Sequence, residues 1–317
     1  MKTIIDIITP TNLPQEKEKF FSSAVYNPQF TYNWDTKELE TFITTHPYYE
    51  KLVTCMVTQD ISGVVGEAER VFETRIDSHV LELANKLVGK KPQIQHNTHF
   101  SLDEVTAAFQ QALDLLDLPY KLVVTDKKGF NFRPNYRKKI IVMNKDISFQ
   151  FFSLDGGIKH ELTHVIRYEN GKHNNIKKSK NYLATEEGLA TYMQDYYGES
   201  GEASLFQHAA EYCVTDIGLK SSLRTMYTYL CRIGFSEELA WQRVIRHKFG
   251  IIDTTLAGDI MKPSMYFYTE QKIKNLSQED LLKLFVGKIS LQDLPKIELY
   301  KGNISKKRLI NFYHLSS

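Results

Sequence analysis

The feature that most constrains this 317-residue chain is an H-E-x-x-H pattern formed by His160, Glu161 and His164. Residues four apart lie on one face of an α-helix, so both imidazoles can reach one metal ion. Glu161 follows the first histidine, where peptidases with this pattern carry their general base. Asn170-Gly171 is a typical end for such a helix, because both residues tolerate the left-handed conformation. The pattern predicts a helix that carries a metal site.

A pair of acidic residues further along the chain supplies a candidate third ligand. Glu186 and Glu187 stand together where a second helix is predicted to begin, and Glu187 comes 23 residues after His164 (187 − 164 = 23). Two histidines and one glutamate leave the fourth position of a zinc ion to water, which is typical of catalytic sites. We therefore predict a zinc-dependent peptidase. The alternative is a surface helix whose histidines and glutamate are simply solvated.

The residues around these ligands resemble a known family. The run H-V-I-R-Y-E-N-G at 164–171, followed by E-E-G-L-A at 186–190, is similar to the microtubule-associated tyrosine carboxypeptidases and their bacterial relatives, the QEGLA-motif proteins. The resemblance implies that Glu187, matching the glutamate of QEGLA, is the third zinc ligand. It extends to residues 27–32 (N-P-Q-F-T-Y), 243–246 (R-V-I-R), Lys262 with Tyr266, and 286–289 (V-G-K-I).

One feature of the chain departs from the family. The ligand helix of the family usually carries H-E-x-x-x-H, whereas this chain has the shorter H-E-x-x-H. The shorter spacing fits a regular α-helix, so the metal site is retained. The substrate preference of such an enzyme depends on how the metal ligands are oriented. The family's substrate preference therefore transfers to this chain less directly than its metal ligands do.

Further side chains complete the predicted site. A carboxypeptidase must hold the free carboxylate of its substrate, and we assign this role to Arg243, Arg246 and Lys262. Tyr266 is a candidate to stabilise the oxyanion of the reaction. The alternative is that both arginines are surface charges on an ordinary helix. We predict that Arg167, Asn170 and Glu186 do not bind the metal themselves but hold its ligands in position.

These assignments lead to one expected function and two alternatives. We expect Zn²⁺ as cofactor, Glu161 as general base, and removal of a C-terminal residue, tyrosine or another aromatic, from a protein or peptide. The resemblance, not the spacing, suggests the carboxypeptidase action. The alternatives are a zinc endopeptidase and a non-catalytic binding or regulatory module that keeps the zinc fold. Lys177, Lys178 and Lys180 form either a solvated loop or a basic surface that attracts acidic, tubulin-like tails.

Bulk composition narrows the partners and the compartment. A net charge of +2 gives no support for nucleic acid or a membrane surface as partner, and no stretch reaches transmembrane length. The three cysteines form no C-x-x-C pair, which is typical of buried thiols in a reducing compartment. The N-terminal segment lacks the apolar length of a signal peptide. We predict a cytoplasmic protein.

The expected fold is α+β and predominantly helical, with a zincin-like metallopeptidase core. We divide the chain into an N-terminal helical region, 1–92, and a catalytic region with C-terminal helices, 93–317, which can also form one continuous domain. Ser101 and Glu104 form a predicted capping box. Residues 120–125 and 138–143 are predicted as strands of a small antiparallel sheet before the metal helix, with residues 130–137 between them and turns marked by Gly129 and Pro134. His96 and His99 are a weaker candidate for a second metal site.

Overall fold

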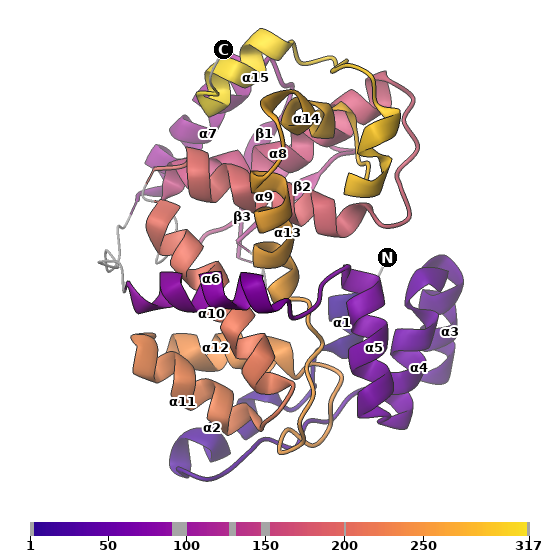
Figure 1. Cartoon of the computed structure of the whole chain (residues 1–317), viewed down its shortest axis with the longest axis vertical. Helices are drawn as coiled ribbons and strands as arrows, with labels where there is room; N and C mark the ends of the chain where they lie inside the picture. Colours follow the sequence, from indigo (N-terminus) through magenta and orange to yellow (C-terminus); the bar gives the residue numbers. More distant parts are fainter. Residues whose placement is uncertain (1–2, 91–99, 127–130, 147–152, 200, 316–317) are drawn as a thin grey trace. The chain divides into compact units, whose positions relative to one another are not determined.

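The structure is a computed structural model, and it describes residues 3–90, 100–126, 131–146, 153–199 and 201–315. His96 and His99 therefore lie outside the described residues. The described residues are predominantly helical, with one small sheet (Figure 1). Within these ranges, no helix combines the length and the apolar character that crossing a bilayer requires.

Internal packing divides the chain into two compact units, Met1–Lys91 with His208–Tyr268, and Pro92–Gln207 with Thr269–Ser317. The limits of the units fall inside two helices, α10 (Gly201–Gly218) and α13 (Ser264–Lys274). A compact unit is defined by which residues pack together, whereas a catalytic region is defined by which residues take part in the reaction. The division at residue 92 into a helical region and a catalytic region therefore stays a prediction.

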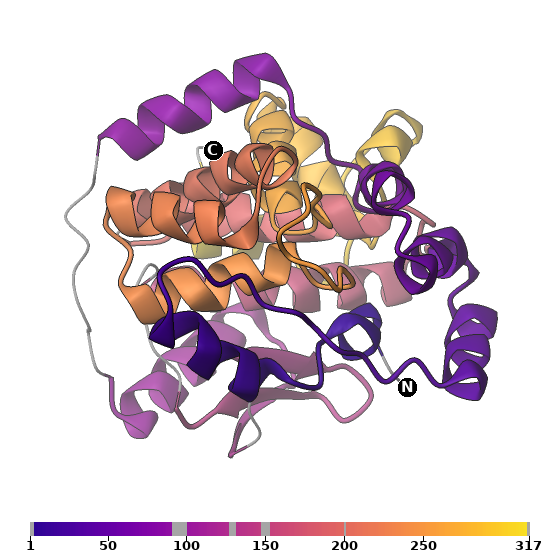
Figure 2. The ribbon, with the colours of Figure 1, turned by 90° about the horizontal axis from the view of Figure 1, so that it is seen from below.

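The regular elements among the described residues of the first unit are all helices, joined by loops and one isolated bridge between Gln29 and Asp253. Aromatic packing joins its distant segments: the Phe20 ring lies 4.9 Å from that of Tyr227 and 4.8 Å from that of Trp241. The indigo helix that carries Phe20 accordingly lies beside the orange helices (Figure 2). Besides parts of α10 and α13, the unit contains α1 (Ile4–Ile8), α2 (Leu13–Ser22), α3 (Thr36–Thr45), η1 (Pro47–Tyr49), α4 (Glu50–Thr58), α5 (Ile61–Phe72), α6 (Ser78–Gly89), α11 (Leu223–Ile233) and α12 (Glu237–His247).

The second unit packs its helices and a sheet around one apolar core. Phe109, Leu162 and Leu189, from three different helices, are fully buried in it. Besides parts of α10 and α13, the unit contains α7 (Leu102–Leu116), β1 (Lys121–Thr125), β2 (Phe132–Asn135), β3 (Ile140–Asn144), α8 (Leu154–His173), α9 (Tyr182–Tyr197), α14 (Gln278–Lys283), η2 (Leu284–Val286), η3 (Leu291–Lys296) and α15 (Lys306–Tyr313). The capping box at the start of α7 is confirmed, since Ser101 Oγ accepts from the Glu104 N–H and Glu104 Oε2 accepts from the Ser101 N–H.

The sheet differs from the prediction. Its order is β1-β3-β2, with β1 parallel and β2 antiparallel to β3, so the predicted purely antiparallel pairing of residues 120–125 with 138–143 is wrong. The reason is that the segment expected to connect the two strands contains the strand β2. Pro134 lies in this strand and cannot donate a ladder hydrogen bond, which an edge strand tolerates.

The metal helix α8 also runs further than predicted. It begins at an N-cap, where Ser153 Oγ accepts from the Gly156 N–H at 2.9 Å, and it ends at His173 rather than at Asn170-Gly171. The predicted helix end is wrong because both residues serve tertiary packing. Asn170 Nδ2 donates to the Phe285 carbonyl at 2.8 Å, and Gly171 lies against the backbone of residue 287.

A second glycine marks a close approach on α9. A Cβ at Gly188 would lie 2.5 Å from Cγ2 of Thr269, so only glycine fits there. Helices α8 and α9 pack side by side (Figure 1), but Thr269 of α13 is what restricts position 188.

Candidate metal centre

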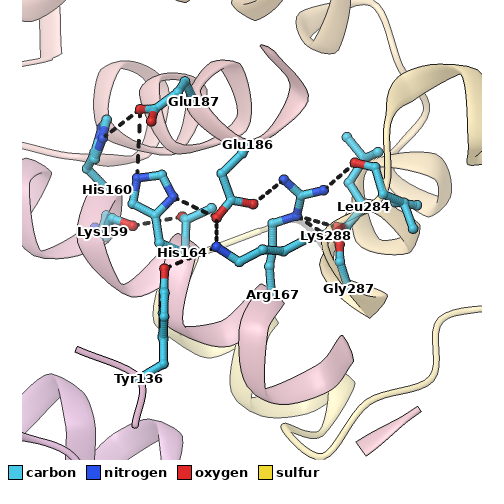
Figure 3. Close-up of polar contacts among 12 residues, drawn as sticks. Tyr136, Lys159, His160, His164, Arg167, Glu186, Glu187, Leu284, Gly287 and Lys288 are labelled. Atoms are coloured by element: carbon cyan, nitrogen blue, oxygen red, sulfur yellow. Dashed lines mark hydrogen bonds and ion pairs between the residues drawn. The ribbon is translucent and has the colours of Figure 1, made fainter. Parts of the chain in front are cut away.

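Three side chains from α8 and α9 converge in the second unit. His160 and His164 lie one turn apart on α8, and Glu187 faces them from α9 (Figure 3). Glu187 Oε2 lies 3.8 Å from His160 Nε2 and 3.9 Å from His164 Nε2. One ligand atom from each of the three residues lies within 4.8 Å of the others, and the group can hold a metal ion.

The donor set fits a divalent transition metal. Atoms bound to one tetrahedral zinc ion at about 2.0–2.1 Å lie about 3.3 Å apart, slightly closer than the distances from the carboxylate oxygen to the two ring nitrogens. Imidazole nitrogen and carboxylate oxygen are both ordinary zinc ligands. In the part of the chain that the structure describes, no other group of three His, Cys, Asp or Glu side chains has this arrangement.

Glu186, next to the third ligand in sequence, faces the other way and is nearly fully buried. Its Oε1 accepts from His164 Nδ1 at 3.0 Å and from Lys288 Nζ at 2.6 Å, and its Oε2 accepts from Arg167 Nη1 at 2.6 Å. Burial alone would raise the pKa of Glu186, but the charges of Arg167 and Lys288 and the hydrogen bond from His164 hold it well below its usual range. The ionised carboxylate can only accept, so it fixes the proton on Nδ1 and leaves Nε2 of His164 for a metal.

Glu161 has an environment suited to proton transfer. Burial raises the pKa of its carboxyl group to about 7, with a further increase from the negative charge of Glu187 and an opposing effect from His164. A general base works best when its pKa lies near the pH of the reaction. The carboxyl group beside the candidate metal ligands is therefore able to exchange a proton at neutral pH.

Arg167 and Asn170, both predicted to support the ligands, lie in different surroundings. Arg167 is fully buried and reaches the ligands through its ion pair with Glu186. Asn170 lies about one turn further along α8, where its Oδ1 accepts from the Ile304 N–H at 3.1 Å. Its described contacts are with C-terminal residues and not with the ligands, so it anchors the C-terminal part of the unit.

The residues predicted to bind substrate lie in the first unit. Arg243 forms an ion pair with Glu211 at 3.1 Å, and Lys262 Nζ donates to the hydroxyl of Tyr266 at 3.2 Å. Arg246 lies on α12 in the same unit. The metal ligands belong to the second unit, so the roles of these residues in binding substrate and stabilising an oxyanion stay predictions.

Lys288 also lies near the ligands, although its sequence context led to no predicted role. It contacts Glu186 directly and also lies 3.1 Å from the hydroxyl of Tyr136. A signal was present, because Lys288 belongs to the V-G-K-I run that carries part of the family resemblance. Tyr136 had no such signal, since it lies in the segment expected to connect the two strands.

Comparison with known proteins shows which sequences this chain resembles. No protein-family model matches the chain. It is 25% identical over 322 residues to microtubule-associated tyrosine carboxypeptidase 1 of Rattus norvegicus and to the protein of the same name from Mus musculus, in both cases across 96% of this chain. The identity to the Homo sapiens protein is 25% over 321 residues. These matches extend over nearly the whole chain and support membership of the microtubule-associated tyrosine carboxypeptidase family. It spans 64% of the length of the rat and mouse proteins and 63% of the human one.

Proposed function

We propose that the protein is a zinc-dependent carboxypeptidase with a zincin-like core. The observation that carries the proposal is the convergence of His160, His164 and Glu187, with Glu161 next to the first ligand. The relatives, which are named as tyrosine carboxypeptidases, support the same reaction class. The proposal combines the chemistry of the site with the family to which the chain belongs.

Each side chain of the site has a separate role in the proposed reaction. His160, His164 and Glu187 hold the zinc ion, and Glu186 orients His164. A bound zinc ion supplies a Lewis acid that polarises a carbonyl group and acidifies a water molecule. Glu161 takes a proton from the attacking water and delivers it to the leaving amine, and the burial that raises the pKa of its carboxyl group favours holding the proton between the two steps.

The substrate is proposed to be the C-terminal tail of a protein or peptide that ends in tyrosine or another aromatic residue. The names of the relatives support tyrosine, and they also mention microtubules. Arg243, Arg246 and Lys262 are proposed to hold the terminal carboxylate, and Tyr266 to stabilise the oxyanion. The lysines of the loop between α8 and α9 are proposed to attract an acidic tail.

We also propose a cytoplasmic location. Cys55, Cys213 and Cys231 all lie among the described residues as free thiols, which is usual in a reducing compartment.

The test uses one peptide in two forms. A peptide that ends in tyrosine is offered to the purified protein with a free and with an amidated C-terminus, and release of tyrosine is measured by mass spectrometry. We expect cleavage of the free form only. Cleavage of both forms at an internal bond would identify an endopeptidase, and cleavage of neither form or of other peptides would favour a binding module.

The variant Glu161→Gln tests the general base. We expect it to bind zinc as the wild type does and to lose turnover by several orders of magnitude, because the amide cannot accept the proton. Glu82→Gln is the matched control, since Glu82 lies exposed on α6 of the first unit and makes only a surface ion pair with Lys86. Turnover by Glu161→Gln at the rate of this control would refute the assignment.

A further inference from the structure

We propose that Lys288 is a positioning residue of the metal site, which acts through Glu186 to hold the imidazole of His164 with Nε2 toward the metal. The inference rests on the proposed metal site and deepens it. It makes a residue 102 positions beyond Glu186 part of the support of a zinc ligand.

The carboxylate of Glu186 is held at both of its oxygens. Oε1 accepts from Lys288 and His164, and Oε2 accepts from Arg167 (Figure 3). Only 3% of the Glu186 residue is exposed, so water does not replace a lost donor easily. Because Lys288 and His164 share one oxygen, the position of the lysine fixes where the acceptor for the imidazole lies.

One short segment supplies Lys288 to Glu186 and also holds the side chain of Arg167, the other cation bonded to Glu186. Residues 284–289, which we call the C-terminal clamp, provide three carbonyl groups that accept from the Arg167 guanidinium, those of Leu284 at 2.9 Å, Gly287 at 3.1 Å and Ile289 at 2.6 Å. Lys288 belongs to the same segment. A displacement of the clamp therefore moves Lys288 and loosens Arg167 at the same time.

The side chain of Lys288 is itself held in place. Its Nζ lies 3.1 Å from the hydroxyl of Tyr136 and over two aromatic rings, 4.7 Å from the ring centre of Tyr136 and 5.6 Å from that of Tyr182. Only 15% of its side chain is exposed. A lysine with free rotation would order Glu186 poorly, whereas this one has a polar partner and a cation–π environment that fix its ammonium group.

The negative charges around the two histidines explain why Glu186 needs a cation as a partner. Glu186 is adjacent to Glu187, and Glu161 lies near the same ligands, so three acidic side chains gather around two histidines. Among the described residues, removing Lys288 leaves Arg167 as the one lysine or arginine bonded to Glu186, and it removes the donor that shares its oxygen with His164. Loss of partners behind a ligand typically lowers metal affinity about 10–100-fold.

The experiment measures zinc affinity by competition with a chromophoric chelator, for full-length wild type, Lys288→Met, Lys288→Arg and Lys178→Met. We expect roughly ten-fold weaker binding for Lys288→Met, the low end of that range. Lys288→Arg should recover most of the affinity because it keeps the charge and a donor. Lys178→Met is the matched control: the Lys178 ammonium lies 3.9 Å from the ring centre of Tyr182 and interacts with Glu186 through charge, without a described hydrogen bond to it.

Two further readouts separate positioning from general destabilisation. Melting temperatures of the zinc-free variants are measured first, and Lys288→Gln replaces Lys288→Met if the latter does not fold. Cobalt(II) bound in place of zinc gives visible absorption bands that respond to ligand geometry, and these should shift in Lys288→Met but not in Lys178→Met. A positioning role predicts that arginine restores the wild-type spectrum.

The outcomes distinguish this inference from the proposed function. Equal zinc affinity and equal cobalt spectra for wild type and Lys288→Met would overturn the inference and leave the proposed function intact. Failure of the wild type to bind zinc would overturn both. A loss of affinity as large in Lys178→Met as in Lys288→Met would also overturn the inference, because the effect would then reflect net charge alone.

Discussion

Replacing Gly171 by alanine tests how closely α8 packs against the C-terminal clamp. A Cβ at this position would lie 3.1 Å from Cα of Gly287 and 3.7 Å from the backbone nitrogen of Lys288. Alanine is favoured over glycine inside a helix by about 1 kcal/mol. Overpacking against backbone costs about 1–3 kcal/mol. We therefore expect Gly171→Ala to be as stable as the wild type or less stable by up to about 2 kcal/mol.

The matched control is Gly66→Ala on α5, where a Cβ meets no atom within 4 Å. This variant should gain about 1 kcal/mol from helix propensity alone. The free energies of unfolding, measured by urea denaturation, should therefore differ by about 1–3 kcal/mol between the two variants. The zinc affinity of Gly171→Ala should also fall, because the clamp moves. Equal stabilisation by both substitutions would refute the close packing of α8 against the clamp.

The remaining predictions concern His247, which is fully buried in the first unit between Glu211 and Asp259. Burial would lower its pKa, but the two carboxylates raise it to about 9, from an ordinary value of 6.5. Because the pKa is raised in the folded state, the stabilisation is fully present below about pH 6.5 and is lost as the pH rises through 9, by an amount on the order of 3 kcal/mol. Melting temperatures between pH 6 and pH 10 check this, and an unchanged melting temperature would contradict it. In His247→Gln the same pH series should lose most of this slope, although the variant is less stable throughout.

The local part of the architecture could be predicted from the sequence. The capping box of Ser101 and Glu104 depends on residues three apart, and the H-E-x-x-H spacing places both histidines on one face of any helix. Glu187 was selected over Glu186 by resemblance. In the structure Glu187 faces both histidines, and Glu186 turns toward Arg167. Local periodicity and a family motif were sufficient for these features.

The features that the sequence did not reveal depend on long-range packing. Strand β2 contains Pro134 and lies in a segment with turn residues, so its pairing with β3 is visible only once the sheet is assembled. Gly171 is a residue type that is common at helix ends, but α8 continues past it. The backbone of the clamp lies so close to this position that a residue without a side chain fits best. Lys288 reaches Glu186 across 102 residues, and no local pattern encodes such a contact.

The central claim is that His160, His164 and Glu187 hold a zinc ion. The most direct test is the zinc content of the wild type and of Glu187→Ala by elemental analysis, with both proteins purified without a metal-binding tag. We predict about one zinc ion per wild-type chain and a sharp reduction in the variant, because two histidines alone bind zinc weakly. A wild type without zinc, or a variant that keeps a full equivalent, would contradict the account.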